Sequence, residues 1–349
     1  MHAFAYLSPG TAGWIEAERP HADGPDGIIR PLMAAPCTSD VHNVAIGCLA
    51  PRRILGHEGL GEVVEVGPQV RDFQVGDLVV IPPVTPDWRT VASQLGAHQH
   101  CDGLISGQKL ANHEDGLFAE YTRIRDLDAN AAHIPEGVSQ EAAVMAADML
   151  NTGLYGAELA DIQPGDTVVV LGVGPVGLMA VAGARLRGAG RIIAIGSRPA
   201  GMALAEFYGA TDRINYKETD PVREVYQLTH KKGADCCICA GGGPEALSQA
   251  VTMVRWGGTV GNVNYFTTSG DLPLNNVRWG FGMGNKTIRG GECPGGRARM
   301  ERLLALVRYG RVDPVPLITH RFSGLDQIET AFHLMAEKPP ELVKTIVSF

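Results

Sequence analysis

The sequence predicts a two-domain α/β protein, in which a β-rich domain precedes a domain built on a parallel sheet. Residues 1 to about 147 contain short β-branched runs broken by Gly, Pro and Asp, such as residues 61–67 and 76–84. This pattern is typical of a β-barrel or a mixed domain. From about residue 165 to 290, apolar runs alternate with Ala-rich segments, as in the βαβ units of a parallel sheet. A chain of 349 residues is also long enough for two domains.

The elements of the second domain follow from local sequence. Residues 166–174 and 191–196 are apolar and β-branched, and residues 175–190 between them are rich in Ala and Gly. Strand, helix and strand in this order form a βαβ unit.

Further elements are expected downstream. Strands are expected at 234–242 and 258–266, and the tail beyond about residue 290 should contain a helix at 301–310 and a closing strand at 342–349.

Composition excludes several classes of protein. Thirty basic and 38 acidic residues give a formal charge of −8, which makes nucleic acid an unexpected partner. Seven cysteines are too few for a disulfide scaffold, and an odd number leaves at least one thiol unpaired, so a reducing cytoplasm is expected. The N-terminus does not resemble a signal peptide, and the uncharged stretch 167–184 is interrupted by glycines and a proline. We therefore expect a cytoplasmic protein that does not bind membranes.

A glycine motif lies at the junction of the first predicted strand and helix of the second domain. It comprises Gly172, Val173, Gly174, Pro175, Val176 and Gly177. In a dinucleotide-binding turn, the first glycine permits a tight bend, the second lets a pyrophosphate approach the backbone, and the third allows close helix packing. The free N–H groups at the helix start attract the anion. The motif therefore predicts a dinucleotide site.

The end of the second strand indicates which dinucleotide binds. An acidic side chain there binds the ribose 2′-hydroxyl of NAD, whereas a cationic one suits the 2′-phosphate of NADP. Residues Gly196, Ser197 and Arg198 stand at this point, and none is a carboxylate. Since Arg198 can pair with a phosphate, NADP(H) is predicted.

Three potential zinc ligands lie in the first domain, namely Cys37, His57 and Glu58. A catalytic zinc needs three protein ligands and an open position, and thiolate and imidazole are suitable donors. A single Cys or His is also often an ordinary core residue. Residue type and spacing by themselves leave both interpretations open.

A longer motif gives these residues a context. GHExxGxVxxVGxxV runs from Gly56 to Val70, followed by Gly76 and Asp77, with Cys37 upstream and GVGPVG downstream. This combination resembles the zinc-dependent medium-chain alcohol dehydrogenase family. PCTSD, TPDW at 85–88, GAGRIIAIGSRP, GATD, NVNYF and CPGGRxRMERL are similar, more specifically, to the bacterial NADP-dependent secondary-alcohol (isopropanol) dehydrogenases, over nearly the whole chain.

The resemblance implies a domain division and a metal site. A GroES-like β-barrel catalytic domain would comprise residues 1–148 and 291–349, and a Rossmann domain with a doubly wound parallel sheet would bind NADP with residues 149–290. The family's zinc ligands fall on Cys37, His57 and Asp148, with Glu58 as a carboxylate able to join them. Without the resemblance, Asp148 would be interpreted as a helix cap. One catalytic zinc is expected and no structural zinc, because that lobe of the family needs four cysteines and the region offers only Cys101.

The resemblance also assigns roles to further residues. Ser39 matches the hydroxyl that takes the alcohol proton, and His42 matches the next member of the proton relay. Asp40 is expected to support the turn or to contact a metal ligand. Expected contacts of the nicotinamide are Val263, Asn264 and Tyr265. Expected contacts of the phosphorylated ribose are Tyr216 and Lys338.

The implied activity is reversible oxidation of a secondary alcohol to a ketone with NADP⁺, by a homotetramer. Two alternatives are a zinc-free NADPH quinone or enone reductase of the same superfamily, and a non-catalytic NADPH-binding structural protein. Gln108 and Glu292 stand where related enzymes carry Trp and Leu in the substrate pocket. Either they favour a more polar substrate, or both side chains turn into solvent.

Overall fold

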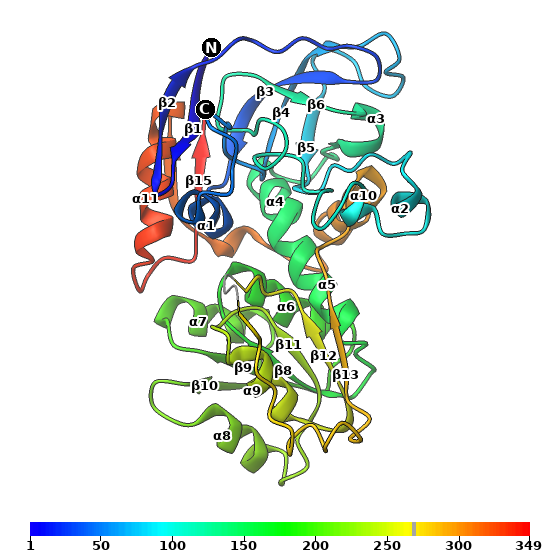
Figure 1. Ribbon diagram of the computed structural model, residues 1–349, viewed down its shortest axis with the longest axis vertical. Helices are drawn as coiled ribbons and strands as arrows, with labels where there is room; N and C mark the ends of the chain where they lie inside the picture. Colours follow the sequence, from blue (N-terminus) through cyan, green and yellow to red (C-terminus); the bar gives the residue numbers. More distant parts are fainter. Residues whose placement is uncertain (267–269) are drawn as a thin grey trace. The chain divides into compact units, whose positions relative to one another are not determined.

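The computed structural model describes residues 1–266 and 270–349. The chain divides into two compact units, the first comprising Met1–Asp148 with Pro294–Phe349 and the second Met149–Cys293 (Figure 1). Each unit has its own sheet and its own apolar core. The second unit is therefore an insertion between two segments of the first.

The first unit is organised around a seven-stranded sheet. Its main path runs through β14 (Ile318–Ser323), β15 (Lys344–Ser348), β3 (Gly27–Ala34), β4 (Gly59–Val66), β5 (Leu78–Ile81) and β7 (Ala132–His133), and β6 (Thr122–Ile124) pairs with β3. A separate antiparallel pair consists of β1 (His2–Ser8) and β2 (Thr11–Glu16). The C-terminal strand β15 joins β3 antiparallel, so the end of the chain completes a sheet begun near its start (Figure 1).

Short helices accompany this sheet. They are α1 (Thr38–Ile46), α2 (Val91–Gln94), α3 (Leu127–Asn130), α4 (Gln140–Met145), α10 (Arg297–Arg308) and α11 (Ile328–Glu337). Helix α11 buries Ile328, Ala331 and Phe332, and the Phe332 ring meets that of Phe4 edge-on with centroids 5.6 Å apart. This spacing of buried residues is the i, i+3, i+4 pattern of an amphipathic helix.

The second unit is a parallel six-stranded sheet with the order β10-β9-β8-β11-β12-β13. Its strands are β8 (Thr167–Leu171), β9 (Arg191–Gly196), β10 (Asp212–Asn215), β11 (Ala234–Cys239), β12 (Val254–Asn262) and β13 (Thr287–Gly290). Numbered within the unit, this order is 3-2-1-4-5-6, which is the Rossmann arrangement. The chain reverses direction across the sheet between β8 and β11, and ligands bind at such a switch point.

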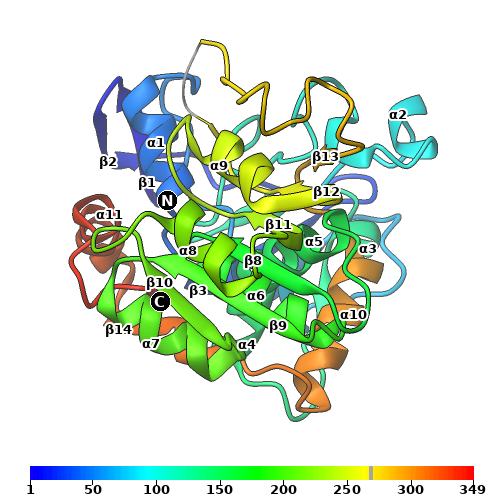
Figure 2. The same ribbon diagram turned by 90° about the horizontal axis from the view of Figure 1, so that it is seen from below.

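Helices cover both faces of the parallel sheet. They are α5 (Asn151–Leu159), α6 (Pro175–Leu186), α7 (Pro199–Tyr208), α8 (Pro221–Leu228) and α9 (Ala246–Met253). Helices α6 and α7 contact each other, as do α8 and α9, and the two pairs lie on opposite sides of the sheet (Figure 2). With both faces covered, the strands are apolar without alternation, which explains runs such as Val168–Leu171.

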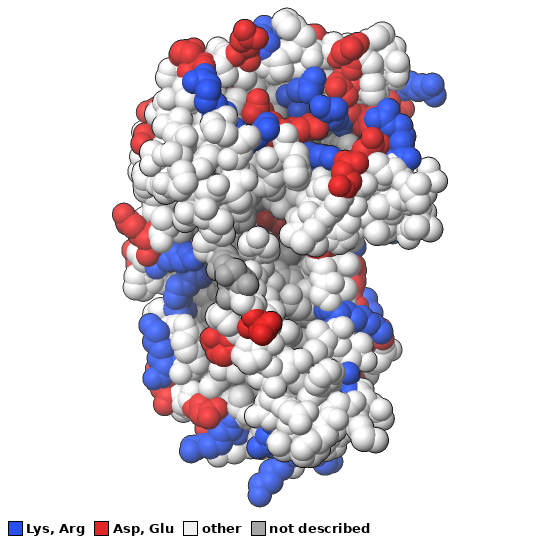
Figure 3. All heavy atoms as spheres, viewed as in Figure 1, with Lys and Arg blue, Asp and Glu red and all other residues white. Residues whose placement is uncertain are grey.

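The strands and helices predicted for the second unit are present, although the strands expected at 234–242 and 258–266 occupy Ala234–Cys239 and Val254–Asn262. The α/β fold class is confirmed. Residues 167–184 form β8 and most of α6. No helix within residues 1–266 and 270–349 is both long and apolar enough to cross a membrane. On the face drawn in Figure 3, acidic and basic side chains are interspersed.

Candidate metal centre and nucleotide-binding site

Four side chains of the first unit converge on one point. Cys37, His57, Glu58 and Asp148 each offer a ligand atom, and these atoms all lie within 4.8 Å of one another. Among residues 1–266 and 270–349, this is the only group of three or more such donors. The fold therefore brings together the four residues expected to hold a metal.

Cys37 is positioned by the start of a helix. It is the N-cap of α1, and the carboxylate of Asp40 accepts a hydrogen bond from its backbone N–H at 3.1 Å. Burial raises the pKa of the Cys37 thiol, but the charge of Lys344 and a hydrogen bond with His57 outweigh it and lower the pKa to about 7. A thiolate, the form that binds metals, is thus accessible near neutral pH.

His57 is fixed by Asp40. Its Nδ1 lies 3.0 Å from Asp40 Oδ1. Burial opposes ionisation of Asp40, but the nearby His57 lowers the pKa of that carboxyl, so the carboxylate accepts and Nδ1 carries the proton. Burial likewise lowers the pKa of His57, but Asp40 and Cys37 raise it well above its usual value. Such a carboxylate partner orients a ligating histidine and selects its tautomer.

The other ring nitrogen of His57 faces the cluster. Nε2 lies 3.2 Å from Ser39 Oγ, 3.6 Å from Glu58 and 4.0 Å from Asp148. The preceding Gly56 has φ +90°, and a Cβ on it would lie 2.3 Å from the Phe118 ring. The glycine therefore allows the turn that presents the imidazole.

Asp148 lies in a π-helical turn, Ala146–Leu150, between α4 and α5. The N-cap position of α5 is Leu150, so the interpretation of Asp148 as a helix cap is wrong. Because the helix continues through this segment, no free helix end is present for the carboxylate to cap. Single π-turns inside helices often occur at functional sites, and this one carries the carboxylate into the donor group.

Lys344 is a member of this site that the sequence analysis missed. Its side chain is 1% exposed, and its Nζ donates to Glu58 Oε1 at 3.0 Å and lies 2.8 Å from Oε2. Burial raises the pKa of Glu58, opposed by Lys344 and reinforced by Cys37 and Asp148, and the pKa ends well above its usual value. The feature of the sequence that could have indicated its role is a lysine within the apolar strand LVKTIVSF, because a buried lysine is nearly always paired with another charged group.

The donor set fits zinc. One sulfur, one imidazole nitrogen and carboxylate oxygens are donors that zinc accepts in a tetrahedral site. Magnesium and calcium prefer oxygen-only sites. Three of the four donors suffice for a catalytic zinc, so one position remains for a small ligand.

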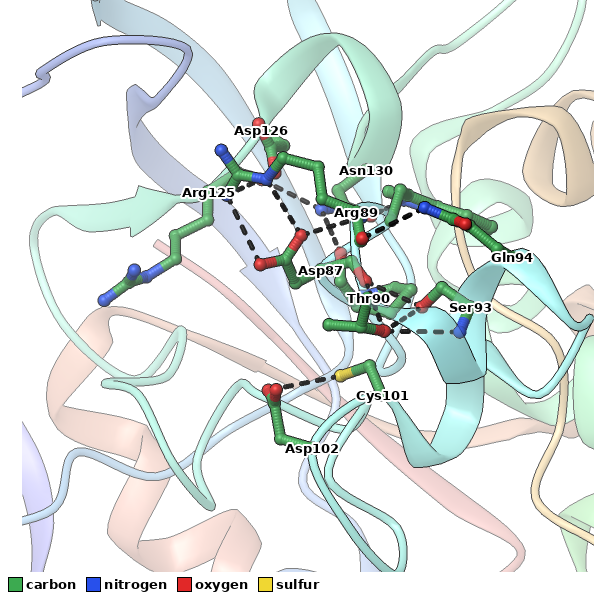
Figure 4. Close-up of polar contacts among 12 residues, drawn as sticks. Asp87, Arg89, Thr90, Ser93, Gln94, Cys101, Asp102, Arg125, Asp126 and Asn130 are labelled. Atoms are coloured by element: carbon green, nitrogen blue, oxygen red, sulfur yellow. Dashed lines mark hydrogen bonds and ion pairs between the residues drawn. The ribbon is translucent and has the colours of Figure 1, made fainter.

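The histidines near Cys101 have other partners. His98 Nε2 accepts a hydrogen bond from the backbone of Gly295 at 3.1 Å, and His100 Nδ1 accepts one from a backbone N–H five residues later. The Cys101 thiol donates to Asp102 at 3.5 Å (Figure 4). These side chains are therefore held by hydrogen bonds within a network of loops.

In the second unit, the glycine motif forms a tight turn from β8 to α6. Gly172 has φ +103°, and a Cβ there would lie 3.0 Å from the backbone of Gly241, which follows β11. A Cβ on Gly177 would lie 1.9 Å from the carbonyl oxygen of Gly172. Gly174 is the N-cap of α6 and Pro175 its first residue. The turn thus lies at the switch point, with the helix N–H groups available to an anion.

Arg198 lies beside this turn. It is the N-cap of α7, directly after β9, and its Nη2 is 3.6 Å from the position a Cβ on Gly174 would take. Burial lowers the pKa of Arg198, and the nearby Tyr216 opposes this effect. The Tyr216 backbone N–H donates to Gly196 at 3.3 Å. The predicted phosphate-binding residues of this unit are therefore neighbours.

The remaining predicted cofactor residues fall in two places. Val263, Asn264 and Tyr265 follow the carboxyl end of β12, and the Asn264 amide donates to Gly242 after β11 at 3.1 Å. Lys338 belongs to the first unit, where it ends α11 in a left-handed conformation. Burial and, to a lesser degree, the charge of Lys338 lower the pKa of His42.

Comparison with known proteins agrees with these features. Residues 25–136 match the family model described as alcohol dehydrogenase GroES-like domain, and residues 175–308 match that described as zinc-binding dehydrogenase. Among curated proteins, the chain is 56% identical to the NADP-dependent isopropanol dehydrogenase of Thermoanaerobacter brockii, and the match covers 99% of each chain. It is 53% identical, over 99% of each chain, to the enzyme of the same name from Clostridium beijerinckii.

Solved structures show the same architecture. Alcohol dehydrogenase TADH from Thermus sp. ATN1 superposes with a TM-score of 0.88 at 30% identity, covering 100% of this chain and 99% of the other. A zinc-dependent alcohol dehydrogenase from Streptococcus pneumonia, in its apo form, gives 0.89 at 28% identity, covering 100% and 98%. With its convergent donors, its Rossmann sheet and these full-length relatives, the chain belongs to the zinc-dependent medium-chain alcohol dehydrogenase family.

Proposed function

We propose that this protein oxidises secondary alcohols to ketones reversibly with NADP(H). The observation that carries this proposal is the convergence of four zinc-type donors within 4.8 Å, in a chain 56% identical to an NADP-dependent isopropanol dehydrogenase. The first unit is proposed as the catalytic domain and the second as the NADP-binding domain. Cys37, His57 and Asp148 would hold the zinc, with Glu58 as an additional carboxylate.

The bound groups supply Lewis-acid and hydride chemistry, since zinc lowers the pKa of an oxygen ligand and the nicotinamide exchanges hydride. The protein contributes positioning and proton transfer. Ser39 Oγ, 3.2 Å from His57 Nε2, is the proposed acceptor of the alcohol proton. His42 lies three residues further on the same helix, and residues so spaced share a helix face. It is the proposed next group in the relay.

NADP specificity is proposed to rest on the end of β9. The glycine turn would hold the pyrophosphate, and Ser197 and Arg198 the 2′-phosphate, because a guanidinium pairs strongly with phosphate. Tyr216, beside Arg198, and Lys338 are the proposed further contacts of that ribose. Val263, Asn264 and Tyr265 are the proposed contacts of the nicotinamide.

The protein is proposed to be a cytoplasmic homotetramer. Support for association comes from the second unit, where all four residues of the edge strand β13 are exposed. Trp256, Phe281 and Met283 are 61%, 68% and 84% exposed. An exposed edge strand invites pairing with another chain, and a second copy of this chain would cover it.

One assay tests the function against its two alternatives. NADPH loss is followed with a panel of ketones and aldehydes before and after treatment with o-phenanthroline, and again after Zn²⁺ is restored. The proposal predicts ketone reduction that chelation abolishes and zinc recovers. Chelator-insensitive turnover would indicate a zinc-free reductase. Tight NADPH binding without any turnover would indicate a structural protein.

The substrate is proposed to carry a second polar group. Gln108 and Glu292 are both partly buried rather than fully solvated, which supports a role in contacting something other than water. The kcat/KM for simple secondary alcohols is compared with that for alcohols bearing a second hydroxyl. A preference for the simple alcohols would contradict the proposal.

A further inference from the structure

Lys344, which is buried against Glu58, has no role in the reaction as described so far. Lys344 is 1% exposed and Glu58 is fully buried, and Nζ lies within 3.0 Å of both carboxylate oxygens. A lysine is costly to bury, and here it contacts one of the four metal donors and no solvent. Glu58 therefore has two possible cationic partners, the metal and Lys344.

The charges of the site explain why a lysine is present. With thiolate and carboxylates ionised, Cys37, Glu58 and Asp148 supply three negative charges, and a divalent ion supplies two positive ones. Lys344 supplies the third. The charges of donors, ion and lysine then sum to zero, which favours burying all of them together.

The geometry also limits what Glu58 can do. A carboxylate has about four lone-pair positions, but an ammonium close to both oxygens of Glu58 occupies the side of the group that it faces. Lys344 donates a hydrogen bond directly to Glu58, and, against the effect of burial, its charge also lowers the pKa of the Cys37 thiol. The contact through which the lysine can position a donor is therefore the one with Glu58.

We propose that Lys344 is a positioning residue that holds Glu58 back from the metal, so that three residues bind the ion and the fourth position stays open for the alcohol. This inference rests on the proposed zinc-dependent function. Without the lysine charge, Glu58 would become a permanent fourth ligand, which would compete with substrate while binding the metal more tightly. Lys344 thus keeps the fourth metal position accessible to substrate, and the protein binds the metal less tightly as a result.

The test compares Lys344→Met, Lys344→Arg, Glu58→Gln and the double variant Lys344→Met/Glu58→Gln. Lys109→Met is the matched control, because Lys109 pairs with Asp102 at 2.6 Å in the same unit and touches no metal donor. Zn²⁺ affinity is measured by competition with a chromophoric chelator. The visible spectrum of the Co²⁺-substituted protein reports what fills the fourth position, since exchange of a water ligand for a carboxylate shifts the absorption bands.

Lys344→Met is expected to lower kcat/KM by about 10- to 100-fold, as loss of groups that orient metal ligands commonly does. Its Zn²⁺ dissociation constant should fall, and its Co²⁺ absorption bands should shift. The double variant should regain the wild-type Co²⁺ spectrum and most of the lost activity. Lys344→Arg should retain both, and Lys109→Met should match the wild type throughout.

A lysine that merely stabilises the fold gives a different result. Zn²⁺ affinity and activity would then fall together in Lys344→Met, the Co²⁺ spectrum would not change, and this would overturn the inference. Should Lys344→Met fail to fold, the double variant, which removes both charges, must still show the wild-type Co²⁺ spectrum, and shifted absorption bands there would also overturn the inference. If the wild type itself bound no zinc, the proposed function would fail instead.

Discussion

The metal centre and the nucleotide-binding turn are assembled in opposite ways. The glycine motif and Arg198, which we propose to bind the cofactor phosphates, lie within or directly after one βαβ unit. The metal centre draws on a helix start, the approach to β4, a π-turn and the C-terminal strand, and Lys344 is 286 residues from its partner Glu58. The first site can be built by local structure, whereas the second exists only when the whole unit has folded.

The two sites also differ in electrostatics. The nucleotide turn offers backbone N–H groups and one arginine to an anion that arrives with its own charge. The metal centre concentrates ionisable groups in a buried place, where burial and close charges shift the pKa of each of Cys37, His57 and Glu58. We therefore expect the metal centre to be more sensitive than the turn to single substitutions and to pH.

The largest effect is expected for His57→Ala. Loss of the imidazole removes one of three proposed zinc ligands, and losing the metal costs several kcal/mol of transition-state stabilisation, or at least about 10³-fold in kcat/KM. Zinc content is measured by elemental analysis and NADPH binding by fluorescence. Unchanged NADPH affinity is expected, because His57 and the turn belong to different units. A zinc-replete, active variant would contradict the ligand assignment.

Ser39→Ala should affect the reaction but not the metal. Without the hydroxyl the alcohol proton has no acceptor beside His57, and loss of a proton-transfer group costs about 10²-fold or more in kcat. Zinc content should equal that of the wild type. Should kcat be unaffected while zinc is lost, Ser39 would be a support for His57 rather than a proton acceptor.

Zinc affinity should fall as the pH is lowered. In the zinc-free protein the pKa of Cys37 is about 7 and that of His57 is well above its usual value, and zinc must displace any proton on either group. Above pH 7 the His57 proton is the main competitor, and below pH 7 the Cys37 proton competes as well, so the loss of affinity per pH unit should become steeper as the pH falls through about 7. Chelator competition between pH 6 and 8 measures this slope, and a flat profile would contradict it.

Arg198→Asp tests the nucleotide-binding site, the second of the two sites compared. A lost charge-assisted hydrogen bond is worth about 1.5–3 kcal/mol, so the KM for NADP should rise about tenfold to 100-fold. The KM for NAD should change less or fall, and zinc content should not change. Steady-state kinetics with both cofactors measures the ratio. An unaltered KM for NADP would mean that another residue holds the 2′-phosphate.

The smallest effects are expected for two glycine variants in the turn. In Gly177→Ala the new Cβ would lie 1.9 Å from the backbone of Gly172. The free energy of unfolding should therefore fall by about 1–3 kcal/mol, and the melting temperature should fall with it. In Gly174→Ala the nearest atom is Arg198 Nη2 at 3.6 Å, so the fold tolerates it while NADP affinity falls severalfold. Equal melting temperatures in the two variants would contradict this division of roles.

Parts of the first unit could be predicted from sequence only through resemblance. By residue type alone Cys37 and His57 were ambiguous and Asp148 suggested a helix cap, so only the resemblance assigned the three to a metal. The structure places Asp148 in a π-turn. Asp40 could be assigned only to a supporting turn or to the surroundings of the ligands. Its contact with the Cys37 backbone is local, but its contact with His57 Nδ1 depends on residues 56–57 lying beside the start of α1, which no local pattern encodes.

The sequence by itself determined the α/β class, the strands and helices of the second unit, and the cofactor motif, because hydrophobic period and glycine positions act over a few residues. Only the tertiary structure decided which distant polar side chains share one buried space. Lys344 shows the difference, since its position in an apolar strand indicates a buried partner, but the identity of that partner depends on how β15 pairs with β3. Long-range strand pairing sets those distances, and no short segment of the chain contains that information.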